Sequence, residues 1–210
     1  MDLTQAILLT IATAATPLLI AAIGELVVER SGVLNLGVEG MMLMGAVSGF
    51  AIAQMTGSAW LGLFAAVLVG AIFSAVFGFL TLILVTNQVA TGLALTILGV
   101  GASALLGESF VGLPGVRLEA IYIPYLTDLP FVGRFLFGQD PIFYLSILLV
   151  VGVAWFLFGT RAGLTLRAIG DSHGSAHALG VHVVRTRYLA VLFGGACAGL
   201  AGAQLSLVYV

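Results

Sequence analysis

The sequence predicts an all-α integral membrane protein, a polytopic bundle of about six transmembrane helices. Of its 210 residues, 61% are hydrophobic and only 8% are charged, whereas a soluble domain carries about 25% charged residues. So few charges cannot cover a surface that faces water, and lipid must therefore solvate most of the chain. The net charge of −2 gives no indication of a nucleic-acid partner.

Five or six apolar segments are long enough to cross a bilayer, because a spanning helix needs about 20 apolar residues. These segments cover residues 3–24, 33–54, 59–85, 88–107, 142–160 and 188–209. The first lacks the basic flank of a signal peptide, so we expect it to be retained as a span. We treat residues 1–210 as one transmembrane domain. No polar cap follows the last apolar run, and we expect a bundle that is truncated at its C-terminus.

Two longer loops carry most of the charge. Residues 108–141 include three acidic residues besides Asp140, two arginines and four of the five prolines, whereas 161–187 carries four arginines against Asp171 alone. Arginine accumulates in short cytoplasmic loops of membrane proteins. The bias therefore places 161–187 in the cytoplasm, and alternation of the spans places 108–141 on the extracellular side.

Small residues recur every four positions in two of the spans. One stripe is Gly62, Ala66, Gly70, Ser74 and Gly78, and the last span contains Gly194, Ala198 and Gly202 beside Gly195, Gly199 and Ala203. Such stripes let helix backbones approach closely in lipid, where hydrophobicity supplies no force between helices. They predict tight packing and do not identify a substrate site.

The stretch from Glu25 to Met44, ELVVERSGVLNLGVEGMMLM, is too charged for a plain span and too apolar for a solvated loop. Polar groups at membrane depth usually face a cavity or a partner, and transporters place broken helices along their substrate route. We therefore expect one broken or re-entrant span, with Asn35 and Glu39 on or beside a substrate path. The alternative is that Glu39 pairs with a neighbouring helix and that Glu25 is interfacial.

Asn87 and Gln88 form a second polar point at the end of a span. We include both as candidate residues of the substrate path. An ordinary helix start explains them equally, because asparagine is a favoured N-cap residue.

The arginine-rich loop is expected to contain a short helix over residues 173–179. Asp171 or Ser172 can cap its start and Gly180 can close it. His173 and His177 lie four residues apart, but no cysteine or carboxylate other than Asp171 completes a metal site. We expect exposed histidines and no metal.

Motifs for catalysis or nucleotide binding are missing from the sequence. It contains no phosphate-binding Walker loop, no nucleophile elbow and no HExxH motif. We therefore expect that this chain is not an enzyme and that any ATP that drives it binds to another chain.

Three separated motifs resemble the permease subunits of ABC importers of the branched-chain amino acid and simple sugar class. They are RSGVLNLGVEGMMLMGA, the proline-containing run IPYLTDLPFVGRFLFGQDPIFYLSILL, and LTLRAIGDSHGSAHALGVHVVRTRYLAVLFGGACAGLAGA. NLGVEG is most similar to the subfamily for simple sugars and nucleosides. Two positions depart from the family pattern: Gly174-Ser175-Ala176 replaces a glutamate-alanine-alanine stretch, and Thr96 stands where an asparagine is common.

The resemblance implies an importer subunit that forms the translocation path for a small polar solute, most simply a nucleoside or simple sugar. It implies a cytoplasmic ATP-binding subunit that holds ATP and Mg, a second permease subunit and an extracytoplasmic substrate-binding protein, all at a bacterial cytoplasmic membrane. The ATPase is expected to contact the coupling loop around Arg167, Gly170, Asp171 and Gly180.

Two alternatives compete with this interpretation. An ion-coupled secondary transporter would use Glu39 as its coupling site and would need no ATPase. A membrane-embedded enzyme would need Glu39 and the loop histidines at one depth, whereas the predicted topology separates them.

Overall fold

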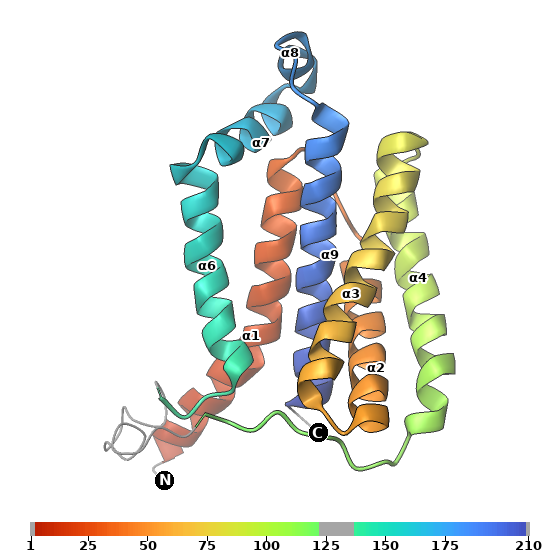
Figure 1. Cartoon of the computed structure of the whole chain (residues 1–210), viewed down its shortest axis with the longest axis vertical. Coiled ribbons are helices and arrows are strands. Elements are labelled where there is room, and N and C mark those ends of the chain that lie inside the picture. Colours follow the sequence, from red (N-terminus) through yellow and green to blue (C-terminus); the bar gives the residue numbers. More distant parts are fainter. Residues whose placement is uncertain (1–2, 122–136, 209–210) are drawn as a thin grey trace.

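The computed structural model describes residues 3–121 and 137–208. In these ranges its helices are α1 (Leu3–Arg30), α2 (Val38–Thr56), α3 (Ala59–Gly78), α4 (Gln88–Gly107), α6 (Pro141–Gly159), α7 (Arg161–Asp171), α8 (His173–Ala178) and α9 (Val183–Leu207). A π-helical turn, Phe79–Ile83, extends α3, and a 3-10 turn, Glu108–Phe110, extends α4. Six of the helices are long and apolar enough to cross a membrane, which confirms the predicted bundle (Figure 1).

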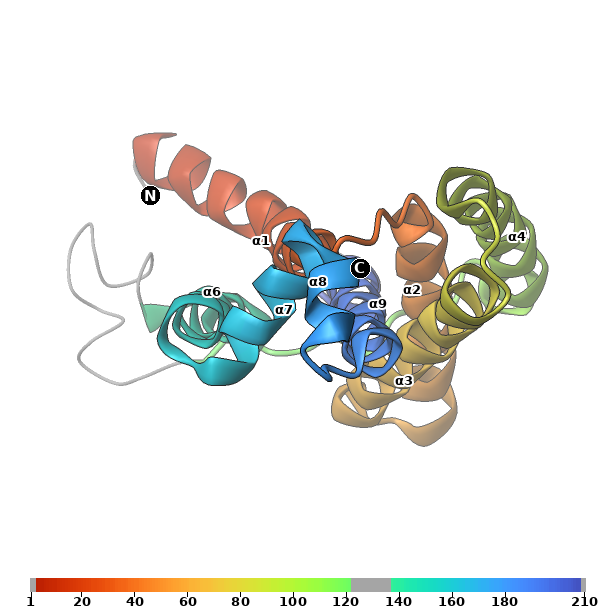
Figure 2. The same ribbon diagram turned by 90° about the horizontal axis from the view of Figure 1, so that it is seen from above.

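Helix α9 lies at the centre of this bundle. It packs against α1 on one side and against α2 and α3 on the other (Figures 1 and 2). In its most apolar stretch 67% of the residues are buried, against 22–39% in the other five spans. Helix α4 packs on α2 and helix α6 packs on α1, so these two helices form the flanks.

The small residues predicted to pack between helices do so. All five members of the α3 stripe are buried, and a Cβ atom added to Gly70 would collide with the carbonyl oxygen of Gly195 in α9. A Cβ on Gly45 of α2 would lie 2.6 Å from the Cα of Gly199. The backbones of α2, α3 and α9 therefore meet almost directly, as helices in lipid require when packing is their main attraction.

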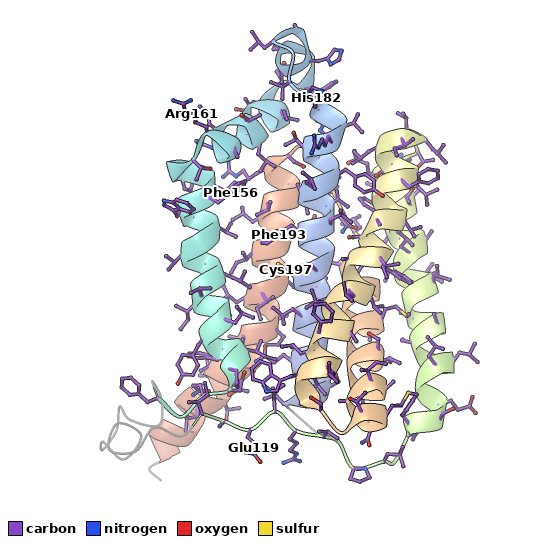
Figure 3. All side chains as sticks on the ribbon, viewed as in Figure 1. Glu119, Phe156, Arg161, His182, Phe193 and Cys197 are labelled. Atoms are coloured by element: carbon purple, nitrogen blue, oxygen red, sulfur yellow. The ribbon has the colours of Figure 1, made fainter. Side chains whose placement is uncertain are left out.

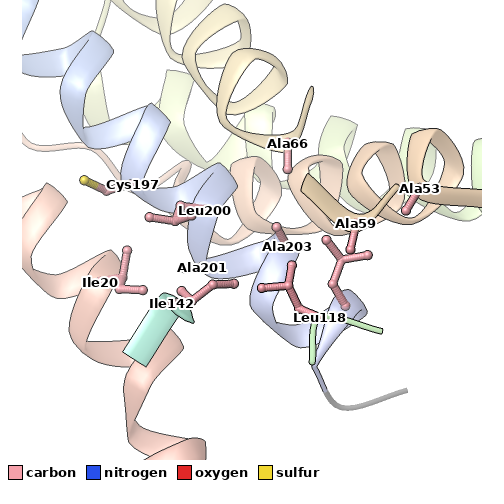
Figure 4. Packing of buried hydrophobic residues seen from close by; sticks show 11 residues of the cluster. Ile20, Ala53, Ala59, Ala66, Leu118, Ile142, Cys197, Leu200, Ala201 and Ala203 are labelled. Atoms are coloured by element: carbon pink, nitrogen blue, oxygen red, sulfur yellow. The ribbon is translucent and has the colours of Figure 1, made fainter. Parts of the chain in front are cut away.

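A cluster of buried apolar side chains closes the bundle where α9 ends (Figure 4). Ile20 of α1, Ala66 of α3, Ile142 of α6 and Leu200 of α9 belong to it. Leu118 joins the cluster from the segment after α4, and its backbone N–H donates to the carbonyl oxygen of Leu207 at 2.9 Å. This hydrogen bond ties the segment across the end of α9. Asp128 and Arg134 of the predicted extracellular loop lie outside the described residues.

Three predicted span boundaries are wrong. The first span continues to Arg30 instead of residue 24, because the carboxylate of Glu25 finds a hydrogen-bond donor inside the bundle. The second span begins at Val38 instead of residue 33, because side chains of other helices hold the preceding residues in a non-helical conformation. The last span begins at Val183 instead of residue 188, so that Arg185 and Arg187, expected in the loop, form part of its first turns.

Candidate functional site

The candidate residues gather towards one end of the bundle. Helices α7 and α8, the last turn of α1 and the start of α4 lie at this end, which we call the α7–α8 end (Figure 1). Arg161 and His182 mark it in Figure 3, and Glu119 marks the opposite end. Among the described residues no group of histidine, cysteine and acidic side chains could hold a metal ion.

The predicted break lies between α1 and α2. Residues 31–37 are non-helical and run from the last turn of α1 down along the bundle to the start of α2 (Figure 1). Gly32 has a φ of +80°, a conformation that only glycine adopts readily, and it turns the chain out of α1. Ser31 is fully buried. This non-helical segment connects α1 to α2, each of which is long and apolar enough to be a span of its own, and it takes up the start of the predicted second span.

Asn35 stabilises the segment 31–37 by hydrogen bonds of its side chain and of its backbone. Its side-chain Oδ1 accepts a hydrogen bond from the Gly37 N–H at 2.9 Å, and its Nδ2 lies 3.7 Å from the sulfur of Met41. Its own backbone N–H donates to Glu25 Oε1 at 3.1 Å. The side chain is 2% exposed, and its hydrogen-bonding atoms face the protein. In this conformation Asn35 shapes the break and does not line an open path.

Helix α4 supplies two further hydrogen bonds to the same segment. Gln88 Oε1 accepts from the Leu34 N–H at 2.9 Å, and the hydroxyl of Thr96 donates to the carbonyl oxygen of Leu36 at 2.9 Å. The two backbones also pack closely, since a Cβ on Gly92 would lie 2.8 Å from the Leu36 nitrogen. Side chains from α1 and α4 thus replace the backbone hydrogen bonds that the interrupted helix lacks.

Glu39 and Asn87 are not part of this network. Asn87 is the N-cap of α4, and its Oδ1 accepts from the Ala90 N–H at 3.1 Å. Glu39 is exposed in the first turn of α2, where its charge favours the helix N-terminus, and it accepts no hydrogen bond from any described residue. The structure therefore joins Asn35 and Gln88 through the break and leaves the other two candidates apart.

The arginine-rich loop forms two helices. Helix α7 is amphipathic: Thr160 caps its start by accepting from the Gly163 N–H at 3.0 Å, and its buried face includes Leu166 and Ile169. The guanidinium of Arg167 lies 5.1 Å from the ring centre of Phe158 in α6, a cation–π geometry. Asp171 ends α7 and is exposed.

Helix α8 confirms the predicted short helix of this loop. Ser172, rather than Asp171, is its N-cap and accepts from the Ser175 N–H at 3.4 Å. Gly180 follows with a φ of +80° and donates its N–H to the carbonyl oxygen of His177 at 2.9 Å, which ends the helix in the left-handed conformation typical of glycine. His173 and His177 are exposed, as expected.

The end of α7 lies against the turn that follows α1. A Cβ on Gly170 would collide with the carbonyl oxygen of Arg30, and a Cβ on Gly32 would lie 3.2 Å from the Cα of Gly170. From α9, Nε of Arg187 donates to the carbonyl oxygen of Ser31 at 2.9 Å. Sequence reasoning singled out Gly170 but used Arg187 only as part of the arginine bias.

Comparison with known proteins agrees with this architecture. Residues 7–210 match the protein family described as the permease component of branched-chain amino acid transport systems. The chain belongs to this permease family. It is therefore a multi-pass membrane protein of a transport family.

The curated relatives of this chain include ABC transporter permeases that are named for sugars or nucleosides. The chain is 44% identical over 201 residues to a putative glucose ABC transporter permease of Haloferax volcanii, covering 93% of this chain and 61% of the relative. It is 34% identical over 202 residues to a guanosine ABC transporter permease of Bacillus subtilis, covering 90% of this chain and 63% of the relative. A nucleoside ABC transporter permease of Lactococcus lactis is 32% identical over 199 residues, with 90% and 63% covered.

The chain thus spans slightly more than three-fifths of the length of these relatives. No solved structure matches the chain. Within the permease family the departure at Thr96 has a visible consequence, because its hydroxyl supplies a donor to Leu36.

Proposed function

We propose that this chain forms the membrane-spanning part of a permease subunit in an ATP-driven importer. The supporting observation is its 32–44% identity, over at least 90% of its residues, to ABC transporter permeases. The relatives act on glucose, guanosine or nucleosides according to their names. The solute proposed here is accordingly a nucleoside or a simple sugar, which needs hydrogen-bond partners more than a charge clamp.

In this proposal ATP and Mg bind to a separate cytoplasmic subunit that docks on the α7–α8 end. The supporting feature is that α7 and α8 project beyond the spans (Figure 1). Arg167, Gly170, Asp171 and Gly180 lie on or between these two helices. A pair of short, connected helices provides an ordered docking surface for an ATPase. Closure of the ATPase can then move the bundle between two packings.

The α7–α8 end faces the cytoplasm in this proposal. The turns at Glu29–Gly32 and at Asn87 share this end with the 161–187 loop, and five of the seven arginines belong to these segments. That distribution agrees with the arginine bias of cytoplasmic loops. The membrane is a bacterial cytoplasmic membrane, and an extracytoplasmic binding protein and a second permease subunit complete the importer.

The non-helical segment 31–37 between α1 and α2 is the proposed element of the translocation path. Asn35 and Gln88 hold its non-helical segment, and Glu39 and Asn87 are exposed beside it at the start of α2 and of α4. Non-helical backbone at membrane depth is tolerated where protein or a water-filled route surrounds it. Solute contacts would come from backbone groups of 31–37 once the hydrogen bonds from α4 rearrange.

The full-length protein, purified with its ATPase and binding protein and reconstituted in liposomes, tests this function. We expect uptake of radiolabelled guanosine or glucose that requires ATP and hydrolysis by the ATPase. Uptake that continues without ATP and follows a pH gradient, and that Glu39→Gln abolishes, would instead establish the ion-coupled alternative. Competition between nucleosides and monosaccharides then identifies the class of solute.

A further inference from the structure

Three distant parts of the chain meet at residues 30–32, the turn that ends α1. They are this turn itself, Gly170 at the end of α7, and Arg187 near the start of α9. We propose that this junction is the joint that transmits movement of the ATPase-docking helices to the non-helical segment 31–37 between α1 and α2, and that Arg187 is its positioning residue. The proposal rests on the function proposed above and assigns it a mechanical route.

The end of α7 and the turn touch through their backbones. Neither Gly170 nor Gly32 could carry a side chain without a collision or strain, because the backbones of Gly170 and Arg30–Gly32 touch. Backbone atoms that already touch cannot approach further unless one of them moves. A shift of α7 towards the turn must therefore displace the turn.

Arg187 ties the same turn to the central helix. Its Nε donates to the Ser31 carbonyl oxygen at 2.9 Å, and its Nη2 lies 2.8 Å from the position of a Cβ on Gly32. Ser31 is fully buried, and its hydroxyl donates to the Val28 carbonyl oxygen at 2.6 Å. A cation beside the last carbonyl groups of α1 also suits the negative end of that helix.

Beyond the turn, the chain of contacts continues along the non-helical segment 31–37. The next residues carry the hydrogen bonds to Glu25, Gln88 and Thr96. Movement at Gly170 can therefore pass through Ser31 to the segment 31–37 and from there to α4. Each step is a hydrogen bond or a backbone contact, so the route is contiguous.

The complete importer provides the test, with coupling measured as solute transported per ATP hydrolysed. Arg187→Gln removes the guanidinium that reaches Ser31, and we expect coupling to fall at least about fivefold while ATP hydrolysis continues. Arg187→Lys keeps a charged donor and should recover part of the loss. Arg185→Gln is the matched control, because Arg185 is exposed two residues earlier in the same helix, and it should couple normally.

Gly170→Ala provides an independent perturbation of the joint from the α7 side. Its Cβ would push against the Arg30 carbonyl oxygen, whereas Gly152→Ala in α6 adds a Cβ with no atom within 4 Å. We expect Gly170→Ala to uncouple and Gly152→Ala to have no effect. Because both changes act on one joint, the double variant with Arg187→Gln should lose little more than the worse single variant.

Three outcomes would overturn the joint. Equal losses of coupling in Arg187→Gln and Arg185→Gln would show that coupling depends only on the positive charge at this end and not on the contact with Ser31. A parallel fall in uptake and ATP hydrolysis that follows the amount of folded protein would reduce Arg187 to a structural role. Multiplying losses in the double variant would contradict a single joint. If the wild-type importer shows no ATP-dependent uptake, the proposed function itself is wrong, a result that the wild type alone identifies.

Discussion

The backbone N–H of Asn35 donates a hydrogen bond to the Oε1 atom of Glu25, 3.1 Å away, across the break between α1 and α2. The acceptor belongs to α1 and the donor to the non-helical segment that leaves it. A carboxylate inside the bundle thus compensates for backbone hydrogen bonding that the interrupted helix gives up. It also explains why α1 continues past an acidic residue that would otherwise be expected to end a span.

Replacement of Glu25 by alanine should destabilise the protein more than replacement by glutamine. Alanine leaves the N–H of Asn35 without an acceptor, and Asn35 is 2% exposed, so the loss should be about 1–3 kcal/mol. Glutamine keeps an acceptor oxygen and should lose less. Thermal unfolding of the purified protein in detergent measures both changes.

Glu29 provides the control for this pair, because it lies one helical turn further along α1 and is exposed. Glu29→Ala should unfold within about 0.5 kcal/mol of the wild type. Equal unfolding temperatures for Glu25→Ala and Glu29→Ala would show that the contact with Asn35 contributes nothing to stability.

Two glycines of α4, two residues apart, should respond oppositely to alanine. A Cβ on Gly99 would lie 2.5 Å from the Cα of Gly40 in α2, whereas a Cβ on Gly101 meets no atom within 4 Å. Gly99→Ala must separate α4 from α2 and should cost about 1–3 kcal/mol. Gly101→Ala should be neutral or stabilising by up to about 1 kcal/mol, because alanine favours the helix. Denaturation of both variants in the same detergent measures the difference, and a tolerated Gly99→Ala would contradict this packing.

Thr96 should be replaceable only by a residue that can still donate a hydrogen bond. Its hydroxyl donates to the Leu36 carbonyl oxygen at 2.9 Å, so Thr96→Val, which keeps the shape, should lose about 0.5–1.5 kcal/mol. Thr96→Ser keeps the donor and should lose less. Thermal unfolding ranks the variants, and a valine variant as stable as the serine variant would show that the bond is not needed.

The sequence predicts the six spans and the packing stripes because both depend on local patterns. Runs of about 20 apolar residues identify a span wherever the rest of the protein lies, and Gly62 to Gly78 repeat every four residues. The break was visible for the same reason, since Gly32, Asn35 and Gly37 interrupt an apolar run. These features can be recognised without knowing the tertiary contacts.

The contacts that stabilise the break could not be predicted in this way. Arg187 lies 156 residues from Ser31 and Gln88 lies 54 residues from Leu34, and no periodic pattern relates such pairs. The sequence marks Asn35 as a polar residue in an apolar run, but whether a buried amide faces a path or its own backbone depends on the folded turn. Arg187 likewise looks like the neighbouring arginines in the sequence, and nothing there indicates that its partner is a carbonyl group.

The N-cap of α6 should make stability depend on pH. Oδ1 of Asp140 accepts from the Phe143 N–H at 3.0 Å, and burial raises the pKa of this carboxyl above its usual range. Because the folded pKa is raised, the folded state holds the proton more tightly than the unfolded chain does. Stability contributed by this group is therefore present at low pH and is lost as pH rises through the folded pKa.

Asp140→Asn tests this dependence directly, since asparagine caps a helix about as well as aspartate but carries no charge to bury. At pH 7 the asparagine variant should be at least as stable as the wild type, and the two should converge as the pH falls towards 4. Asp140→Ala removes the cap and should be about 1 kcal/mol less stable than Asp140→Asn at every pH, because neither side chain titrates. Unfolding temperatures of the three proteins, measured in one detergent between pH 4 and 8, provide the comparison. A wild type that gains stability relative to Asp140→Asn as pH rises would show that the charged carboxylate, stabilised by the α6 N-terminus, outweighs its burial.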